Sequence, residues 1–192
     1  AAMGDKDVVV WDLATGSEVQ RLTPPLSVVS SGRSTLEFSP DGTMLAKGGE
    51  DGTAHLHLWR LDTGRLTRLT GHDDGVVAVA FHPDGSVLAS AGLDGRVVLW
   101  DPATGSELAT AGDHPGGILA AQFSGDGRWL ATAASTGVVA LRDPRNGTVV
   151  ATIGHPDAVR SLAFSRDGAL LATGCDDRTA RLFTRLDGRT GP

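Results

Sequence analysis

The sequence predicts an all-β protein made of repeated four-stranded antiparallel sheets, and three observations lead to this prediction. A turn recurs after an apolar strand that ends in phenylalanine, with Phe38, Phe81, Phe123 and Phe164 standing 43, 42 and 41 residues apart. Apolar runs stop at Gly or Pro too early for the 3.6-residue periodicity of helical repeats. Asp-Gly, Thr-Gly and Asn-Gly turns separate these runs, as in antiparallel hairpins.

The elements follow the same order in each unit, and the second repeat shows this order clearly. Phe81 ends the first strand, the run 87–89 forms the second, and Trp100 closes the third. A turn at Gly105 then leads into a weaker fourth strand. Four short strands per unit are typical of a sheet that is repeated radially. We expect one domain over 1–192, with units at 5–22 (partial), 23–64, 65–105, 106–147 and 148–186.

Three short motifs resemble a known repeat. Gly71-His72 precedes a first strand, Asp-Gly turns recur, and Trp-Asp closes the third strand at 11–12 and at 100–101, with Trp59-Arg60 carrying half of that signature. In these features the chain resembles the WD-repeat (WD40-type) β-propeller family, over nearly its whole length. The resemblance implies a β-propeller of four-stranded antiparallel blades, with about four WD-type repeats in the chain.

The resemblance also implies a buried hydrogen-bond chain in the second repeat. His72, Ser90, Asp94 and Trp100 match the four places at which the family has a His, a Ser or Thr, an Asp and a Trp. Such a chain would pair each buried donor and hold one blade rigidly.

The other repeats depart from this pattern to different degrees. In the last repeat His155, Thr173 and Asp177 match, but Phe183 cannot donate as an indole does, so we expect a shorter chain. The third repeat keeps His and Thr but departs where Asp and Trp are expected, and the first has Lys on its second strand. Positions for these departures are His114, Thr132, Thr136, Arg142 and Lys47.

Composition and charge exclude several classes of partner. The net charge is −6, and only two lysines join the arginines, so no basic stripe is expected and nucleic acid is not a predicted partner. Apolar stretches such as 76–81 are far shorter than a membrane span, so we predict no membrane association. The single cysteine, Cys175, forms no internal disulfide and fits a small buried side chain in a cytoplasmic protein.

Residues that invite an enzymatic or metal-binding interpretation are better explained structurally. His72, Ser90 and Asp94 stand at the spacing of the structural chain, and no Gly-x-Ser-x-Gly elbow is present. His55 and His57 share one strand face, but a third ligand cannot be named, so we expect two surface histidines and no metal. Nucleotide-binding glycine motifs are also missing, so we predict no cofactor and no catalytic residue.

Loops at the ends of the blades are the expected functional surface. Family members generally act as scaffolds, and the resemblance implies partner contacts just before the structural Asp and on the first strand. These positions differ in every repeat, as a recognition surface requires. The candidates are Glu50, Leu93, Ser135 and Asp176, with Ser34, Val77, Leu119 and Arg160. We therefore expect a non-catalytic protein-binding scaffold, the alternatives being an enzyme or ligand-binding domain at the channel mouth, or part of a larger signalling protein.

The number of repeats raises the question of ring closure. The chain begins with third and fourth strands near 8–11 and 18–22, and its last repeat stops after a third strand. The N-terminal outer strand would complete that last blade, either within one chain as a strained four-bladed ring or between two chains as an eight-bladed ring. Open edges favour the second arrangement, so we expect a homodimer.

Overall fold

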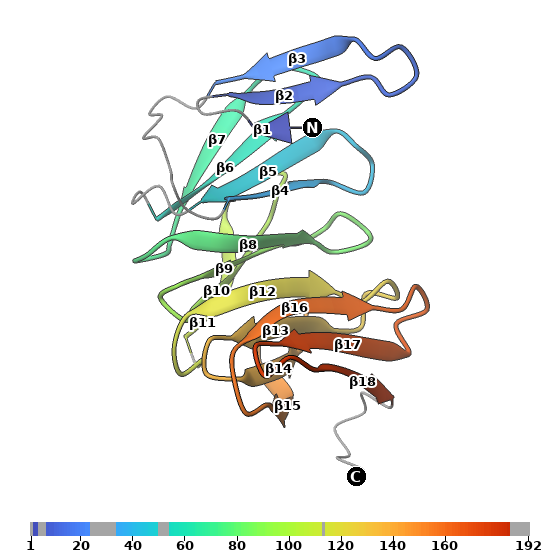
Figure 1. The fold of residues 1–192 in the computed structure, drawn as a ribbon. Coiled ribbons are helices and arrows are strands. Elements are labelled where there is room, and N and C mark those ends of the chain that lie inside the picture. Colours follow the sequence, from blue (N-terminus) through green and yellow to red (C-terminus); the bar gives the residue numbers. More distant parts are fainter. Residues whose placement is uncertain (1, 4–6, 24–33, 50–53, 113, 185–192) are drawn as a thin grey trace.

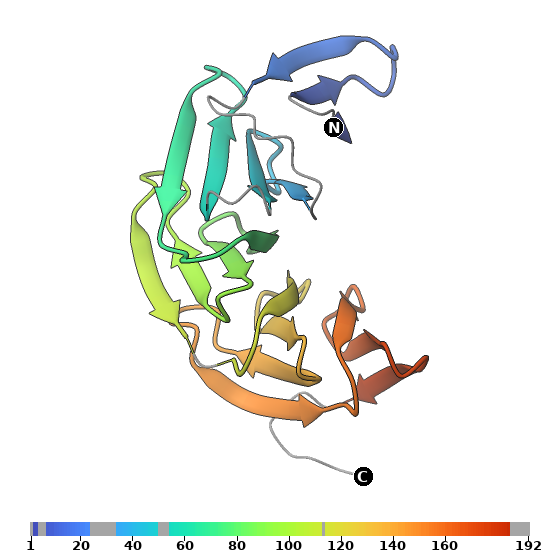
Figure 2. The same cartoon turned by 60° about the vertical axis from the view of Figure 1, so that its left-hand side comes forward.

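The computed structural model describes residues 2–3, 7–23, 34–49, 54–112 and 114–184, which form strands, turns and loops. Figure 1 shows these strands as a stack of small sheets, and Figure 2 shows the stack curving into an open arc. Among the described residues there is no helix that could cross a membrane. The all-β prediction and the repeated antiparallel sheets are confirmed.

Five groups of strands follow one another along the arc. The N-terminal sheet contains β1 (Ala2–Met3), β2 (Val8–Trp11) and β3 (Glu18–Leu22). The first blade contains β4 (Ser34–Phe38), β5 (Met44–Gly49), β6 (His55–Arg60) and β7 (Leu66–Thr70). The second contains β8 (Val76–Phe81), β9 (Leu88–Gly92), β10 (Val97–Trp100) and β11 (Glu107–Ala111). The third contains β12 (Ile118–Phe123), β13 (Leu130–Ala134), β14 (Val138–Arg142) and β15 (Val149–Gly154), and the fourth contains β16 (Val159–Phe164), β17 (Leu170–Cys175) and β18 (Ala180–Thr184).

Each blade is a meander in which consecutive strands pair antiparallel, as the short turns require. The first and second blades are also joined by one bridge between Gly49 of β5 and Val76 of β8, so that their strands form a single hydrogen-bonded path. The inner strands β8 and β12 lie next to each other, as do β12 and β16. The blades therefore pack face to face around the inside of the arc.

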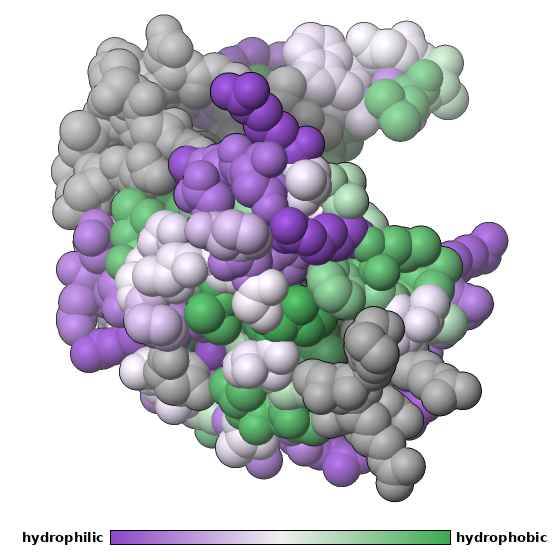
Figure 3. All heavy atoms as spheres, turned by 60° about the horizontal axis from the view of Figure 1, so that its bottom comes forward, coloured by the Kyte–Doolittle hydropathy of each residue, from purple (hydrophilic) through white to green (hydrophobic). Residues whose placement is uncertain are grey.

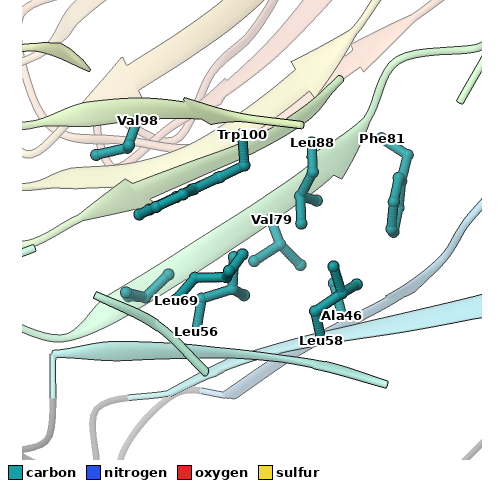
Figure 4. Close-up of a cluster of buried hydrophobic side chains, with 10 residues drawn as sticks. Ala46, Leu56, Leu58, Leu69, Val79, Phe81, Leu88, Val98 and Trp100 are labelled. Carbon is teal, nitrogen blue, oxygen red and sulfur yellow. The ribbon is translucent and has the colours of Figure 1, made fainter. Parts of the chain in front are cut away.

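Apolar side chains fill the space between adjacent blades. Figure 4 shows Leu56 and Leu58 of β6 facing Val98 and Trp100 of β10, with Val79 of β8 between them. The inner strand β8 is buried at all six positions, because a blade covers each of its two faces. Outer strands such as β11 alternate between exposed and half-buried residues, since only their inner side meets a neighbour. This burial of both faces explains why inner strands appear as continuous apolar runs in the sequence.

Polar contacts fasten the inner ends of the blades at three successive junctions. The carboxyl of Glu37 accepts a hydrogen bond from the backbone N–H of Phe81 in the next blade. Gln122 occupies the same place in the third blade, and its Oε1 accepts from the N–H of Phe164 at 3.1 Å. The second blade has an alanine there, and His82 instead contacts the carbonyl oxygen of Gly127 at 3.0 Å through Nε2.

The two ends of the arc leave sheet faces uncovered. Leu182 of β18 is 63% exposed, although the equivalent Leu99 and Leu141 of inner blades are 1% and 2% exposed. Trp11 of β2 is 45% exposed, whereas Trp100 is 3% exposed. Figure 3, in which the bottom of Figure 1 comes forward, shows apolar patches on the side of the molecule turned toward the reader. The end blades thus lack the neighbour that covers every inner blade.

The chain does not close on itself as a four-bladed ring. The N-terminal sheet and the fourth blade lie at opposite ends of the arc, with a wide gap between them (Figure 2). Strand β3 also pairs with β2, from Val8 opposite Leu22 to Trp11 opposite Glu18. Within one chain it therefore does not serve as the outer strand of the fourth blade.

The first prediction concerns the buried carboxyl at the junction of the first and second blades. Burial raises the pKa of Glu37 to about 7, from an ordinary value of 4.5. Because the folded state holds this proton more tightly, its contribution to stability is complete below pH 4.5 and is lost as the pH rises through 7. Glu37→Gln keeps the acceptor, as Gln122 shows, so we expect the variant to be more stable than the parent by roughly 1–3 kcal/mol at pH 8 and equal to it at pH 4.5.

Urea unfolding of both proteins at pH 4.5 and pH 8 measures this difference. Glu107→Gln, which removes an exposed carboxyl from β11, serves as the control and should leave the pH dependence of the parent unchanged. A parent protein whose unfolding free energy varies with pH as that of Glu37→Gln does would contradict the assignment.

Candidate functional site

The second blade contains a closed chain of four polar side chains. His72 Nε2 lies 2.8 Å from Ser90 Oγ, and His72 Nδ1 lies 3.0 Å from Asp94 Oδ2. Trp100 Nε1 donates to the same Ser90 oxygen at 2.8 Å. An ionised Asp94 can only accept, so His72 donates from Nδ1, Ser90 donates to His72 Nε2, and the indole donates to Ser90. Every polar atom of this buried group has a partner, and three strands and a loop are thereby tied together.

Asp94 anchors the chain because its carboxylate also holds the turn between β9 and β10. It accepts the backbone N–H groups of Arg96 at 3.0 Å and Asp73 at 2.9 Å. Burial raises the pKa of Asp94, but these two hydrogen bonds and the proximity of His72 outweigh burial and hold the pKa below its usual value. The carboxylate is therefore ionised at neutral pH.

The contacts among His72, Ser90 and Asp94 resemble those of a hydrolytic triad, yet they are not positioned for catalysis. Ser90 is 0% exposed, and its oxygen already receives the indole N–H of Trp100. A substrate carbonyl cannot approach an oxygen that is fully covered and saturated with hydrogen bonds. The arrangement stabilises the blade.

The fourth blade contains a shorter chain than the matching residues suggested. His155 Nε2 lies 2.8 Å from Thr173 Oγ1, as in the second blade. Asp177 does not continue this chain, because its carboxylate accepts from Thr179 and, at 2.6 Å, from Arg181. These contacts hold the pKa of Asp177 well below its usual range, the Thr179 hydroxyl contributing most. The described residues offer His155 Nδ1 no hydrogen-bond partner.

Phe183 stands where the second blade has an indole. Its ring packs edge to face on His155, with 5.8 Å between the ring centroids. Burial, together with the positive charge of Arg181, lowers the pKa of His155. The imidazole is therefore kept neutral, and its role in this blade is packing and one hydrogen bond to Thr173.

The third blade replaces the indole by a buried guanidinium. His114 Nε2 lies 2.7 Å from Thr132 Oγ1, and Arg142 Nε donates to the same oxygen at 3.0 Å. Arg142 also donates to the carbonyl oxygen of Gly147 at 2.9 Å and is 0% exposed. The sequence indicated only that this blade departs from the pattern. The missed signal is that arginine, like tryptophan, carries an N–H donor that can reach the second strand.

The first blade has no such hydroxyl, and its histidines differ from the prediction of two surface side chains. His57 is 5% exposed and packs beside Trp59, with ring centroids 5.7 Å apart. It is buried because the N-terminal sheet packs on this blade, where Val8 and Leu22 contact Trp59. His55 is half-buried. Across the described part of the chain, the His, Cys, Asp and Glu side chains form no group of three able to hold a metal ion.

The predicted partner-binding residues are brought together in pairs, one pair for each of three blades. The backbone N–H of Leu93 donates to Gly75, two residues before Val77. The same contact recurs from Ser135 to Gly117, two residues before Leu119, and from Asp176 to Ala158, two residues before Arg160. Residues from two different loops thus form one position in each blade, on the face where β8, β12 and β16 begin. We call this the upper face.

A β-bulge sets the direction of one residue in each pair. The register of β8 shifts between Val76 and Ala78, that of β12 between Ile118 and Ala120, and that of β16 between Val159 and Ser161. Val77, Leu119 and Arg160 are the extra residues at these shifts. A bulge turns a side chain away from the regular alternation of the strand. Sequence reasoning found these positions through the repeat alignment but not the bulge itself.

The pairs differ in exposure and chemistry. Arg160 and Asp176 are exposed and form an ion pair of 2.6 Å, which raises the pKa of Arg160. Ser135 is exposed, and Leu119 and Leu93 are half-buried. Val77 is a correction, because at 7% exposed it offers almost no surface to a partner. Glu50 lies outside the described residues, and Ser34 begins β4 without a described side chain.

The second prediction concerns the polar chain of the second blade. Ser90→Ala removes one hydroxyl and leaves His72 Nε2 and the Trp100 indole N–H buried without a partner, so we expect a loss of about 2–3 kcal/mol in unfolding free energy. Chemical denaturation measures this loss, and Ser106→Ala on an exposed turn serves as the control. Equal stability of the two variants would show that the chain does not hold the blade.

A comparison with known protein families agrees with this architecture. The family model described as WD domain, G-beta repeat matches the chain at residues 24–57, 64–101, 105–143 and 147–184. These four matches cover most of the sequence and coincide with the four blades. Repeated blades, the His-Ser-Asp-Trp chain of the second blade and the four family matches agree, and the chain therefore belongs to the WD40 repeat family.

Proposed function

We propose that this chain is a non-catalytic scaffold that binds other proteins or peptides in the cytoplasm through its upper face. The observation that supports this proposal is the set of three residue pairs described above. Each pair occupies the same position in its blade, but its chemistry changes from Val77 and Leu93, through Leu119 and Ser135, to Arg160 and Asp176. A constant backbone with variable side chains suits recognition of a specific partner.

The ionisable groups of the described residues favour this proposal over an enzyme. A catalytic site would bring several groups with perturbed pKa values together in an accessible cleft. The buried Glu37 accepts a backbone N–H and lies between two inner strands. Carboxyls with lowered pKa values, such as Asp41 and Asp84, owe the shift mainly to hydroxyl groups of neighbouring turn residues. These groups are explained by the structure of the turns and junctions.

The third prediction tests the upper face. Leu119→Glu with Ser135→Arg alters one recognition position while leaving the blade core intact, and we expect loss of the specific partner. Affinity capture with quantitative mass spectrometry would compare this variant with the parent and with Ser106→Arg, an exposed substitution at the other end of the blades. Proteins retained by the parent and by Ser106→Arg but lost from the double variant are the expected result. An identical set of proteins on all three baits would contradict the proposal.

Self-association is a second proposal, and the uncovered ends of the arc support it. Every inner blade has both faces covered, whereas Leu182 at one end and Trp11 at the other are exposed. Two chains arranged head to tail would cover each exposed face with the opposite end of the partner. The contact would repeat the packing between neighbouring blades of one chain.

The fourth prediction is therefore a homodimer in solution. Light scattering after size-exclusion chromatography should give twice the chain mass of 19.8 kDa. Leu182→Asp would place a charge in the proposed contact and should shift the protein to monomer, while Leu108→Asp, at an exposed leucine of the outer strand β11, should leave the mass unchanged. A parent protein that is monomeric at all concentrations would overturn this proposal and leave the scaffold proposal untouched.

A further inference from the structure

We propose that the cleft between the second and third blades binds an acidic peptide segment that carries an apolar side chain. The cleft lies on the lower face, which is the face at which β8 and β12 end. It is therefore a second surface, separate from the upper face proposed above. Its volume is about 610 Å³, within the range of small-ligand and peptide side-chain sites. The residues that matter most to the proposal are Arg128, Trp129, Pro144, Arg145 and Val150, with Val87 from the neighbouring blade.

Comparison between repeats shows which of these residues are special to the third blade. In the second blade the places of Arg128, Trp129 and Arg145 are taken by Ser86, Val87 and Ala103. The corresponding cleft between the first and second blades is smaller, about 370 Å³, and its lining contains neither an arginine nor an aromatic side chain. The turns are the same, so the added charge and the indole are not needed for the fold.

The two arginines of the cleft have no carboxylate partner. Arg96 and Arg160 each form an ion pair of 2.7 or 2.6 Å on the upper face. Arg128 and Arg145 are both exposed, and within the described chain neither forms such a pair. Arg128 is close enough to Asp126 only to help lower the pKa of that carboxyl. Two guanidinium groups in one cleft are thus available to a carboxylate ligand.

Three aspartates also line the cleft, but their oxygens are engaged in the turns. Asp84 Oδ1 accepts from the backbone N–H and hydroxyl of Ser86 at 2.8 and 2.6 Å. Asp126 Oδ1 accepts from the hydroxyl of Ser124 at 2.6 Å, and Asp143 Oδ1 accepts from the N–H of Arg145 at 2.8 Å. Equivalent aspartates occur in the turns of other blades, where they serve the same purpose. They weaken the attraction for an acidic ligand without replacing it, so we expect modest affinity.

The apolar part of the cleft favours a side chain rather than a bare anion. Trp129, Val87 and Pro144 are half-buried, and Val150 of β15 is 48% exposed. An aromatic or branched side chain placed there would cover this surface, while flanking carboxylates meet Arg128 and Arg145. A basic segment would instead meet two unpaired guanidinium groups, which disfavours it.

The test uses short fluorescent peptides and variants that copy the second blade. The probe alternates glutamate and phenylalanine; one comparison peptide has lysine for glutamate and another has serine for phenylalanine. The triple variant Arg128→Ser, Trp129→Val, Arg145→Ala places second-blade residues in the third blade, so the fold should tolerate it. The control variant, Arg65→Ser with Arg68→Ala, removes two exposed arginines from the first blade.

Fluorescence anisotropy should show binding of the glutamate–phenylalanine peptide that weakens as salt is added. We expect affinity to fall about tenfold or more in the triple variant, and to remain unchanged in the control variant. Equal or tighter binding of the lysine peptide, equal binding by the triple variant, or no binding of the acidic probe would overturn the proposal. None of these results bears on the upper face, because Leu119 and Ser135 are unchanged in every variant.

Discussion

The whole structure depends on covering both faces of each small sheet. A four-stranded blade with apolar residues on both sides, such as the one that contains β8 and β9, is not stable in water alone. Neighbouring blades supply that cover, and the junctions are fastened by polar contacts from Glu37, His82 and Gln122. The same requirement explains the two ends, where Leu182 and Trp11 remain exposed because no neighbour follows. Stability and self-association are thus two consequences of one constraint.

The blades meet a second requirement in three different ways. A buried hydroxyl on the second strand needs both a donor and an acceptor, and Ser90 finds them in Trp100 and His72. Thr132 uses a guanidinium in place of the indole, and Thr173 has only its histidine, with an aromatic ring filling the space. The blade therefore tolerates changes of residue type when the replacement still donates or still packs. Such tolerance lets repeats diverge, and divergence gives the upper and lower faces their different chemistry.

Much of the fold was predictable from the sequence, because turn residues and the spacing of phenylalanines are local signals. The polar chain of the second blade was equally predictable, since its four residues stand at fixed distances in the repeat. The conformation of Asp177 was not, because Arg181 competes for its carboxylate across the turn. The burial of Val77 and His57 was also missed, since each depends on elements that lie elsewhere along the chain.

The sequence by itself determined the repeat, the strand order within a blade and the type of residue at each turn, because these depend on neighbours only a few residues apart. Tertiary structure decided which side chains meet between blades, whether the chain closes on itself, and where clefts form. Arg128 and Arg145 belong to different turns, and only the folding of one blade against the next brings them to the same cleft with Val87. The curvature of the arc is likewise a property of packed faces, which a pattern along one strand does not specify.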